Sequence, residues 1–551
     1  MFLTIASFVC FTSLVAFLTW RITRNSDVES DEGYFLAGRS LTGVFIAGSL
    51  LLTNLSTEQI VGLNGSAYEN GLSVMVWETL AAIAMVLTAI FLLPRYLKGG
   101  LTTIPGFLAN RFDLTTKTLT SILFLSGYAV VLLPVILYSG SLAISGMFNV
   151  PELLGVSHTK SIWICIWGIG IVGSIYAVFG GLKAVAVSDS INAIGLLIGG
   201  LLIPFLGLIM IGDGSLLNGI SILTSEHPEK FKSMGGPTDP VPFYTIFTGM
   251  MLVQLFYWGT NQQIIQRALG AKNLKEGQKG LLLASFIKIL GPVIVVLPGI
   301  IAFHLFKGNL ETPDSAYPAL VKEVLTNEAL IGFFAAVIFG AILSSFNSVL
   351  NSSVTLFGID VYKQHLNKNA NENTIVKYGK IFGVLLAISS MLIAPQIANA
   401  GSLFAYLQEI NGIYSIPILT IIVVGYTTKR VPAIAAKIAL FSGCLLYILS
   451  QFFMQPYFTN KALENAKNAG ISNQESLNLI EAQAYPHFLD IMAILFLVNV
   501  LIMLLIGKLS PRKDNFVQKY TEQVDITPWK YVKFSGIIVC LTVILTYIYF
   551  K

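Results

Sequence analysis

Residues 54–59 read Asn-Leu-Ser-Thr-Glu-Gln and interrupt an apolar run that extends from Leu41 to Leu63. A charged side chain at bilayer depth costs about 3 kcal/mol on insertion scales. Polar groups and irregular backbone are tolerated at that depth only where they are buried in protein or line a cavity. The hexad therefore indicates a binding site inside a membrane protein. The alternative is that its side chains only satisfy the backbone of a kinked helix.

The composition of the chain is that of a polytopic membrane protein. Of its 551 residues 54% are hydrophobic and 11% are charged, and the mean hydropathy is +0.74. A soluble protein of this length could not hide so much apolar surface. The net charge of +5 forms no basic face, which excludes a nucleic-acid partner. The cysteines and histidines are scattered, without the spacing of a disulfide framework or of a transition-metal site.

The apolar runs predict an all-α fold with about 14 transmembrane helices, since one span needs about 20 apolar residues. The expected limits are about 2–21, 41–64, 72–94, 118–148, 161–180, 185–211, 241–262, 281–306, 329–360, 378–397, 402–426, 434–452, 487–507 and 534–550.

The distribution of positive charge predicts how these spans are oriented. With the N-terminus outside, most of the 34 lysines and arginines fall in inner segments, as the positive-inside rule requires. The first apolar run, Phe2 to Trp20, has its arginines after it rather than before it, so we interpret it as a span and not a signal peptide. We expect residues 1–551 to form one multi-pass domain of the plasma (inner) membrane, with both termini outside.

Two of the expected spans are broken by polar residues. The second breaks at the hexad, and the seventh breaks at Tyr257-Trp-Gly-Thr-Asn-Gln-Gln263. Polar interruptions at matching positions in two halves are typical of transporters built from inverted repeats, with the binding site at the midplane. The spacing predicts two five-helix repeats, about 41–211 and 241–426. The helices at about 2–21 and 434–550 would be peripheral.

Two opposite charges lie inside apolar spans. Glu78 is in the third span and Lys288 is in the eighth. A buried carboxylate can accept hydrogen bonds from two hydroxyls of a polyol. The structural alternatives are that the two residues pair with each other, that Glu78 lies in the outer headgroup region, or that Lys288 snorkels to a membrane face.

The ninth span holds hydroxyls on adjacent turns, in Ala341-Ile-Leu-Ser-Ser345-Phe-Asn-Ser348. A hard monovalent cation takes several oxygen ligands, which Ser344 and Ser345 would supply together with the freed carbonyls near Leu52 and Leu55. Serines in membrane helices also bond to the carbonyl four residues back, which is the ordinary alternative.

Other polar and aromatic residues in the spans extend this set of candidates. Asp189 near the start of the sixth span would guide cations or cap the helix. Amides in apolar surroundings suit a sugar, and aromatic rings offer flat faces for one, although such rings more often only pack. These candidates are Gln59, Gln254, Gln408 with Glu409, Tyr257 and Trp258.

Several stretches together resemble the sodium/solute symporter family, and within it the bacterial sodium/galactose branch. The resemblance runs from about residue 34 to 430. The stretches are Tyr34-Phe-Leu-Ala-Gly-Arg-Ser40, the hexad, Thr103-Ile-Pro-Gly-Phe107, Gly180 to Asp189, Tyr257-Trp-Gly259, Asn261-Gln262, Ile264-Ile-Gln-Arg267 and Ala341 to Ser345.

This resemblance implies a leucine-transporter-type core that moves its substrate with sodium by alternating access. It places the sodium ligands at the carbonyls of Leu52, Leu55 and Ala341 and the hydroxyls of Ser344 and Ser345. It implies a sugar site at Gln59, Glu78, Gln254, Lys288 and Gln408, with Tyr257 as the inner gate.

The sequence departs from the family pattern at three sugar-site or pathway positions: Ala81 replaces a serine, Gln254 an asparagine and Asn192 a glutamine. A second ion would have to use Asp189, Asn347 and Ser348. The fourth span has no arginine, which acid-transporting relatives use, so a neutral substrate is favoured.

Our hypothesis is sodium-driven uptake of a monosaccharide, with no enzymatic activity. Three alternatives stay open. They are sodium-coupled uptake of an amino acid, vitamin or organic acid; a proton-coupled carrier that uses Glu58, Glu78 or Asp189; and a membrane sensor that does not transport.

Overall fold

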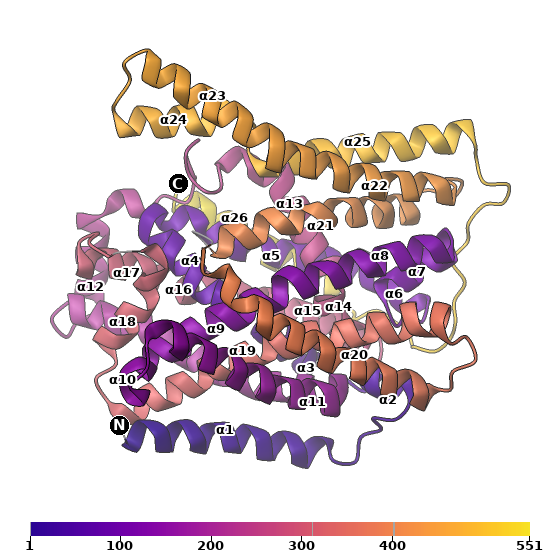
Figure 1. Ribbon diagram of the computed structural model, residues 1–551, viewed down its shortest axis with the longest axis horizontal. Helices are drawn as coiled ribbons and strands as arrows, with labels where there is room; N and C mark the ends of the chain where they lie inside the picture. Colours follow the sequence, from indigo (N-terminus) through magenta and orange to yellow (C-terminus); the bar gives the residue numbers. More distant parts are fainter. Residues whose placement is uncertain (1, 311, 400–402) are drawn as a thin grey trace.

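The structure is a computed structural model that describes residues 2–310, 312–399 and 403–551. Within these ranges the regular elements are helices, and the only β-type pairing is an isolated parallel bridge between Leu41 and Ala271. Figure 1 shows most long helices running roughly side by side, with α1 (Phe2–Thr23) along one edge. Both termini lie at the same end of this bundle (Figure 1).

The first part of the chain supplies the helices up to residue 211. They are α2 (Asp31–Leu36), α3 (Gly43–Asn54), α4 (Thr57–Asn70), α5 (Val76–Leu87), α6 (Leu93–Lys98), α7 (Ile104–Arg111), α8 (Leu114–Gly127), α9 (Leu133–Met147), α10 (Val150–Leu154) and α11 (His158–Ile211).

The second part continues to residue 427. Its helices are α12 (Leu216–Glu226), α13 (Gly249–Gly259), α14 (Gln262–Leu269), α15 (Leu274–Lys288), α16 (Gly291–Val295), α17 (Leu297–Phe306), α18 (Ala316–Val324), α19 (Glu328–Thr355), α20 (Glu372–Ile393) and α21 (Leu403–Thr427). The remainder forms α22 (Ala433–Leu449), α23 (Gln455–Asn468), α24 (Gln474–Ala484), α25 (Phe488–Leu509) and α26 (Val532–Tyr549).

The two predicted helix breaks are present. Helix α3 ends at Asn54, Leu55 has φ −76° and ψ 57°, and Ser56 is extended before α4 begins. Helix α13 ends at Gly259, and the Asn261 side chain accepts a hydrogen bond from the amide of Gln263 at the start of α14. A break of this kind frees the last carbonyls of the first helix and the first amides of the second.

The count of long apolar helices is lower than the predicted 14. Among the described residues, 11 helices are long and apolar enough to cross a membrane, or 12 if the pair Leu274–Lys288 and Gly291–Phe306, bent by 50°, is one span. The segments before the two breaks do not pass this test, because α3 has only 12 residues and α13 only 11, whereas α4 is counted within the passing segment Thr57–Lys98.

Helix α11 joins two spans without a loop. It is continuous except at Gly181, where φ is 62° and ψ is −175°. The backbone thus turns sharply at the junction of the apolar segments His158–Val178 and Gly180–Ile211. Only glycine adopts this backbone conformation easily, and a side chain would also meet the Tyr34 carbonyl oxygen at 3.0 Å.

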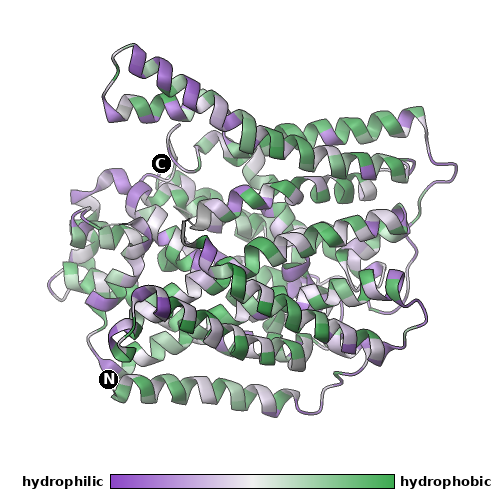
Figure 2. Ribbon diagram, in the orientation of Figure 1, coloured by the Kyte–Doolittle hydropathy of each residue, from purple (hydrophilic) through white to green (hydrophobic). Residues whose placement is uncertain are grey.

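Hydrophobic residues predominate along the long helices, whereas hydrophilic residues are concentrated in the connecting segments and at helix ends (Figure 2). The first and last helices are the least covered by protein: 17% of the apolar window of α1 is buried and 22% of that of α26, against 72% for Thr57–Lys98. The central helices, which carry the candidate residues, are thus shielded by helices that present apolar surface outward.

Candidate functional site

The oxygen-rich break after α3 faces the hydroxyls of α19. Ser345 Oγ donates a hydrogen bond to the Thr53 carbonyl at 3.1 Å and to the Ala341 carbonyl at 3.2 Å. The Ser344 hydroxyl is buried and has no hydrogen-bond partner among the described residues. Leu52 and Leu55 are buried beside this junction. An orphaned buried hydroxyl next to freed carbonyls is a donor set of oxygens only, which suits a hard cation such as sodium.

Asp189 lies close to this junction but does not cap a helix. It is two turns beyond the Gly181 break, buried, and accepts a hydrogen bond from Ser49 at 2.5 Å. The Arg267 guanidinium lies 3.9 Å from the same carboxylate oxygen and donates to Ser49 at 2.8 Å. Its other nitrogens donate to the Ser348 hydroxyl and the Gln263 carbonyl.

Arg267 was not predicted as a site residue. Its position suggested an inner loop charge, yet it is only 1% exposed in α14. The signal that could have identified it is the neighbouring polar pattern, since Gln262, Gln263 and Gln266 are also buried. These polar residues share one face of α14, and because every residue of the helix is buried, that face packs against other polar groups rather than lipid.

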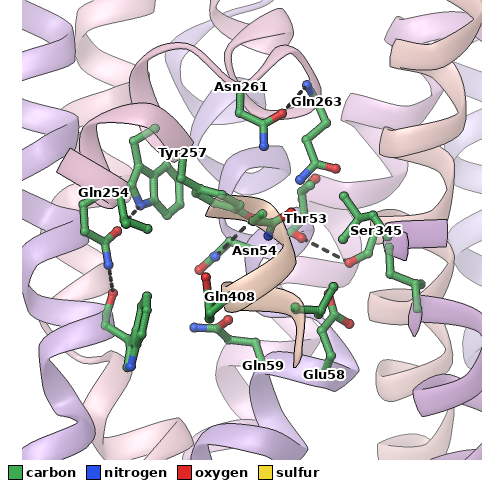
Figure 3. Close-up of a pocket in the computed structure, with 17 residues that line it drawn as sticks. Thr53, Asn54, Glu58, Gln59, Gln254, Tyr257, Asn261, Gln263, Ser345 and Gln408 are labelled. Atoms are coloured by element: carbon green, nitrogen blue, oxygen red, sulfur yellow. Dashed lines mark hydrogen bonds between the residues drawn. The ribbon is translucent and has the colours of Figure 1, made fainter. Parts of the chain in front are cut away.

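A cavity of about 60 Å³ lies between the two broken helices, which is room for about four water molecules. Figure 3 shows the residues around it, with the polar ends of Asn54, Gln59 and Gln408 gathered together. The cavity is lined by Thr53, Asn54, Glu58, Gln59, Trp77, Leu132, Ile136, Val253, Gln254, Tyr257, Trp258, Asn261, Gln263, Ser345, Leu407, Gln408 and Asn411.

Four of the six predicted substrate residues line this cavity, whereas Glu78 and Lys288 do not. Lys288 donates to Glu78 at 2.5 Å, and both side chains are buried. Gln59 in turn donates to the other Glu78 oxygen at 2.9 Å. The structure therefore has the direct ion pair, and the Lys288 ammonium group does not snorkel to a membrane face. Glu78 reaches the cavity through the amide of Gln59.

Hydrogen bonds hold the aromatic residues that α13 contributes to the cavity lining. Trp258 Nε1 donates to Gln254 at 3.2 Å, and Gln254 donates to the Trp77 carbonyl at 3.0 Å. Asn54 donates to the Tyr257 hydroxyl at 3.3 Å, which joins the two broken helices (Figure 3). The amide of Gln254 is thus engaged on both its atoms, whereas Glu58 Oε2 is buried without a partner.

As far as the chain is described, the lining holds one carboxylate and no lysine or arginine. Glu58 is its acidic member, and the other polar members are amides, hydroxyls and aromatic N–H or O–H groups. Ala81, which replaces a family serine, is buried outside the lining. Such a set donates and accepts hydrogen bonds but offers no cation to a negatively charged solute. Asn261, Gln263 and Asn411 also line the cavity and were not predicted.

The chain is similar in sequence to known symporters and cotransporters. The chain is 47% identical over 97% of its length to an uncharacterized symporter, YidK, of Escherichia coli, covering 89% of that protein. It is 32% identical to the sodium/glucose cotransporter of Vibrio parahaemolyticus, over 77% of this chain and 80% of that one. It is 30% identical to the human sodium/myo-inositol cotransporter 2, over 77% of this chain and 66% of that one.

Solved structures show the same fold. A Na⁺-coupled sialic acid symporter in a substrate-bound outward-open state matches with a TM-score of 0.67 at 17% identity, over 91% of this chain and 98% of that one. A nucleobase-cation-symport-1 family transporter in a closed conformation matches with a TM-score of 0.52 at 15% identity, over 86% and 94%. The family model described as the sodium:solute symporter family matches residues 34–443. The chain therefore belongs to the sodium:solute symporter family and is a sodium-coupled transporter, not an enzyme.

Proposed function

We propose that the protein imports a neutral polyol, specifically a monosaccharide, together with sodium by alternating access. The observation that carries this proposal is the cavity lining, in which amides, hydroxyls and aromatic faces surround a single carboxylate. A sugar supplies hydroxyls for the amides and an apolar ring face for Trp77, Tyr257 or Trp258. The relatives named for glucose and myo-inositol take solutes of this class.

The architecture proposed for this function has 14 membrane crossings. Twelve are the long apolar helices with the bent pair counted as one span, and the other two are the broken helices, which begin with α3 and α13 and continue into α4 and α14. These open two inverted five-helix repeats, about 41–211 and 241–426, in a leucine-transporter-type core. Breaks at the first helix of each repeat are what such a core requires at its midplane site. The protein would lie in the plasma (inner) membrane with both termini outside.

Sodium would bind between α3 and α19. Its ligands would be the carbonyls of Leu52, Leu55 and Ala341 with the hydroxyls of Ser344 and Ser345. The buried, unpartnered Ser344 hydroxyl supports this assignment. Asp189 would guide the ion, and its contacts with Ser49 and Arg267 hold the carboxylate in place beside the path.

Sugar would bind against Gln59, Gln254, Tyr257 and Gln408 after the cavity has widened. Glu78 and Lys288 would act one step removed, because they orient the Gln59 amide. The driving force is sufficient for accumulation. A potential of 100 mV gives about 2.3 kcal/mol per charge, and a tenfold sodium gradient adds about 1.4 kcal/mol. One sodium ion can thus support roughly 500-fold accumulation of a neutral solute.

The test is uptake into proteoliposomes of labelled sugars, amino acids and organic acids, with and without a sodium gradient. The proposal expects sodium-dependent, electrogenic uptake of a monosaccharide that unlabelled sugars inhibit. Uptake confined to amino acids or acids would overturn the sugar assignment. Uptake that persists without sodium and collapses with a protonophore would overturn the assignment of sodium as the coupling ion.

A further inference from the structure

A group of imidazole and carboxylate side chains lies away from the cavity, where α12 ends beside α17. Glu226 is the last residue of α12, His227 follows it, and His304 is near the end of α17. The two histidines are 77 residues apart in the sequence, yet His227 Nε2 and His304 Nδ1 are 3.2 Å apart. His304 Nδ1 is also 3.5 Å from Glu226 Oε2, and the three ligand atoms lie within 4.8 Å of one another.

We propose that Glu226, His227 and His304 bind a transition-metal ion, with Zn²⁺ as the best fit. Zinc is held tetrahedrally by imidazole nitrogens at about 2.0–2.1 Å, which puts neighbouring ligand atoms about 3.3 Å apart. The distances of 3.2 and 3.5 Å correspond to two edges of such a tetrahedron. A proton on His304 Nδ1 explains only one of these contacts, since it cannot point at both acceptors. A metal ion satisfies all three atoms.

A carboxylate lies on the far side of His227, within ion-pair range but beyond hydrogen-bond distance. His227 Nδ1 lies 3.7 Å from Glu229 Oε1, and a ligating imidazole usually gives its second N–H to a carboxylate that fixes the ring and its tautomer. The ring also packs edge-on against Phe303, with centroids 5.2 Å apart. Nε2 is thereby aimed at His304.

The charges around the site favour a cation. Glu226 and Glu229 flank the two imidazoles, and the ammonium group of Lys230 points to backbone carbonyls instead of to the cluster. Lys230 Nζ donates to the carbonyls of Tyr68 and Glu69 at 3.0 and 2.6 Å. Glu226 is 59% exposed whereas the histidine side chains are about 20% exposed. The site is therefore preformed on its protein side and open to solvent for a fourth ligand, a water molecule.

A bound ion would fasten α12 to α17. Figure 1 shows both helices at the end of the bundle that carries the chain termini, which is the outer end in the proposed orientation. The site is thus reached from outside the cell. It is separate from the cavity lining, and its occupancy does not depend on which solute is transported.

The test is a titration of tag-free, chelator-treated protein in detergent with Co²⁺, whose visible absorption reports tetrahedral coordination, followed by displacement with Zn²⁺. The expected result is one ion per chain. His304→Ala should weaken binding at least tenfold, on the order of the loss for a damaged metal site. Glu226→Gln should also weaken it, and because this side chain is exposed, the fold is kept. His158→Ala removes a histidine outside the cluster and should bind as the parent does.

The proposal is overturned if no saturable tetrahedral band forms, or if both His304→Ala and Glu226→Gln bind cobalt as tightly as the parent. The unfolding temperature of each variant is measured in the presence of a chelator. A variant that unfolds at the parental temperature has kept its fold, so a loss of metal binding in that variant is due to the missing ligand. Zn²⁺ should raise the unfolding temperature of the parent and of His158→Ala only, because an ion that binds the native state stabilises it.

Discussion

Removal of the Ser345 hydroxyl, which lies between the proposed sodium site and the cavity lining, should weaken sodium binding. Ser345 is 2% exposed, and its hydroxyl bridges α19 to the Thr53 carbonyl at 3.1 Å. In the proposed site it also supplies one of five oxygen ligands. An interaction with a charged partner contributes about 1.5–3 kcal/mol, and each 1.4 kcal/mol is about a tenfold change in affinity. Ser345→Ala should therefore raise the half-saturating sodium concentration by about 10–100-fold.

The chain offers a matched control on the same helix. Ser353 is also buried, but its hydroxyl donates only to the Val349 carbonyl four residues back in α19. Ser353→Ala removes a comparable hydroxyl with no contact to α3, so its sodium dependence should match the parent. The assay is initial solute uptake into proteoliposomes at stepped sodium concentrations and constant ionic strength. Equal sodium dependence in Ser345→Ala and the parent, or equal shifts in both variants, would refute the ligand assignment.

Three further outcomes are expected. Lys288→Met should lower stability in detergent by about 3–5 kcal/mol because it leaves the buried Glu78 carboxylate unpaired, and adding Glu78→Gln should restore much of the loss; strictly additive losses would show that the pair is not coupled. Glu58→Gln should raise the solute KM by about 10–100-fold, since a charge-assisted hydrogen bond contributes about 1.5–3 kcal/mol, and an unchanged KM would exclude contact with the solute. Partial burial raises the pKa of Asp113, but hydrogen bonds from Lys437 and from the first turn of α8 outweigh this effect and hold the pKa below its ordinary value. The ionised Asp113 carboxylate therefore stabilises the folded protein. This stabilisation is complete above the unfolded pKa of about 3.9 and is lost as the pH falls through the lower folded value. Unfolding temperatures of Asp113→Ala and the parent should thus converge in acid, and a constant difference between them would contradict the cap and ion-pair assignment.

The breaks in α3–α4 and α13–α14 could be predicted from the sequence because polar residues interrupt apolar runs there, and a bilayer gives no other reason for them. The Glu78–Lys288 contact was one of the predicted alternatives for the same reason. Hydropathy reports the depth of a residue in the membrane but not its lateral neighbours. It therefore could not show that Gln59 stands between Glu78 and the cavity.

The burial of Arg267 was missed for a related physical reason. Basic residues near span ends usually report topology, so one that turns inward to Asp189 and Ser348 has the same local pattern as one that faces water. The pairing of His227 with His304 across 77 residues is equally invisible to spacing rules. Both contacts depend on how separate helices pack, which one sequence without a template does not reveal.

The turn at Gly181 has a mechanical consequence. With one residue between two membrane segments, and the Tyr34 hydroxyl donating to the Val178 carbonyl at 2.8 Å beside it, the two halves of α11 have no slack. A rocking motion of the first half is therefore transmitted directly to the second half. Asp189 lies on that second half, so its distances to Ser49 and Arg267 depend on the tilt of the preceding segment. A flexible insertion at this corner would let the two segments move independently.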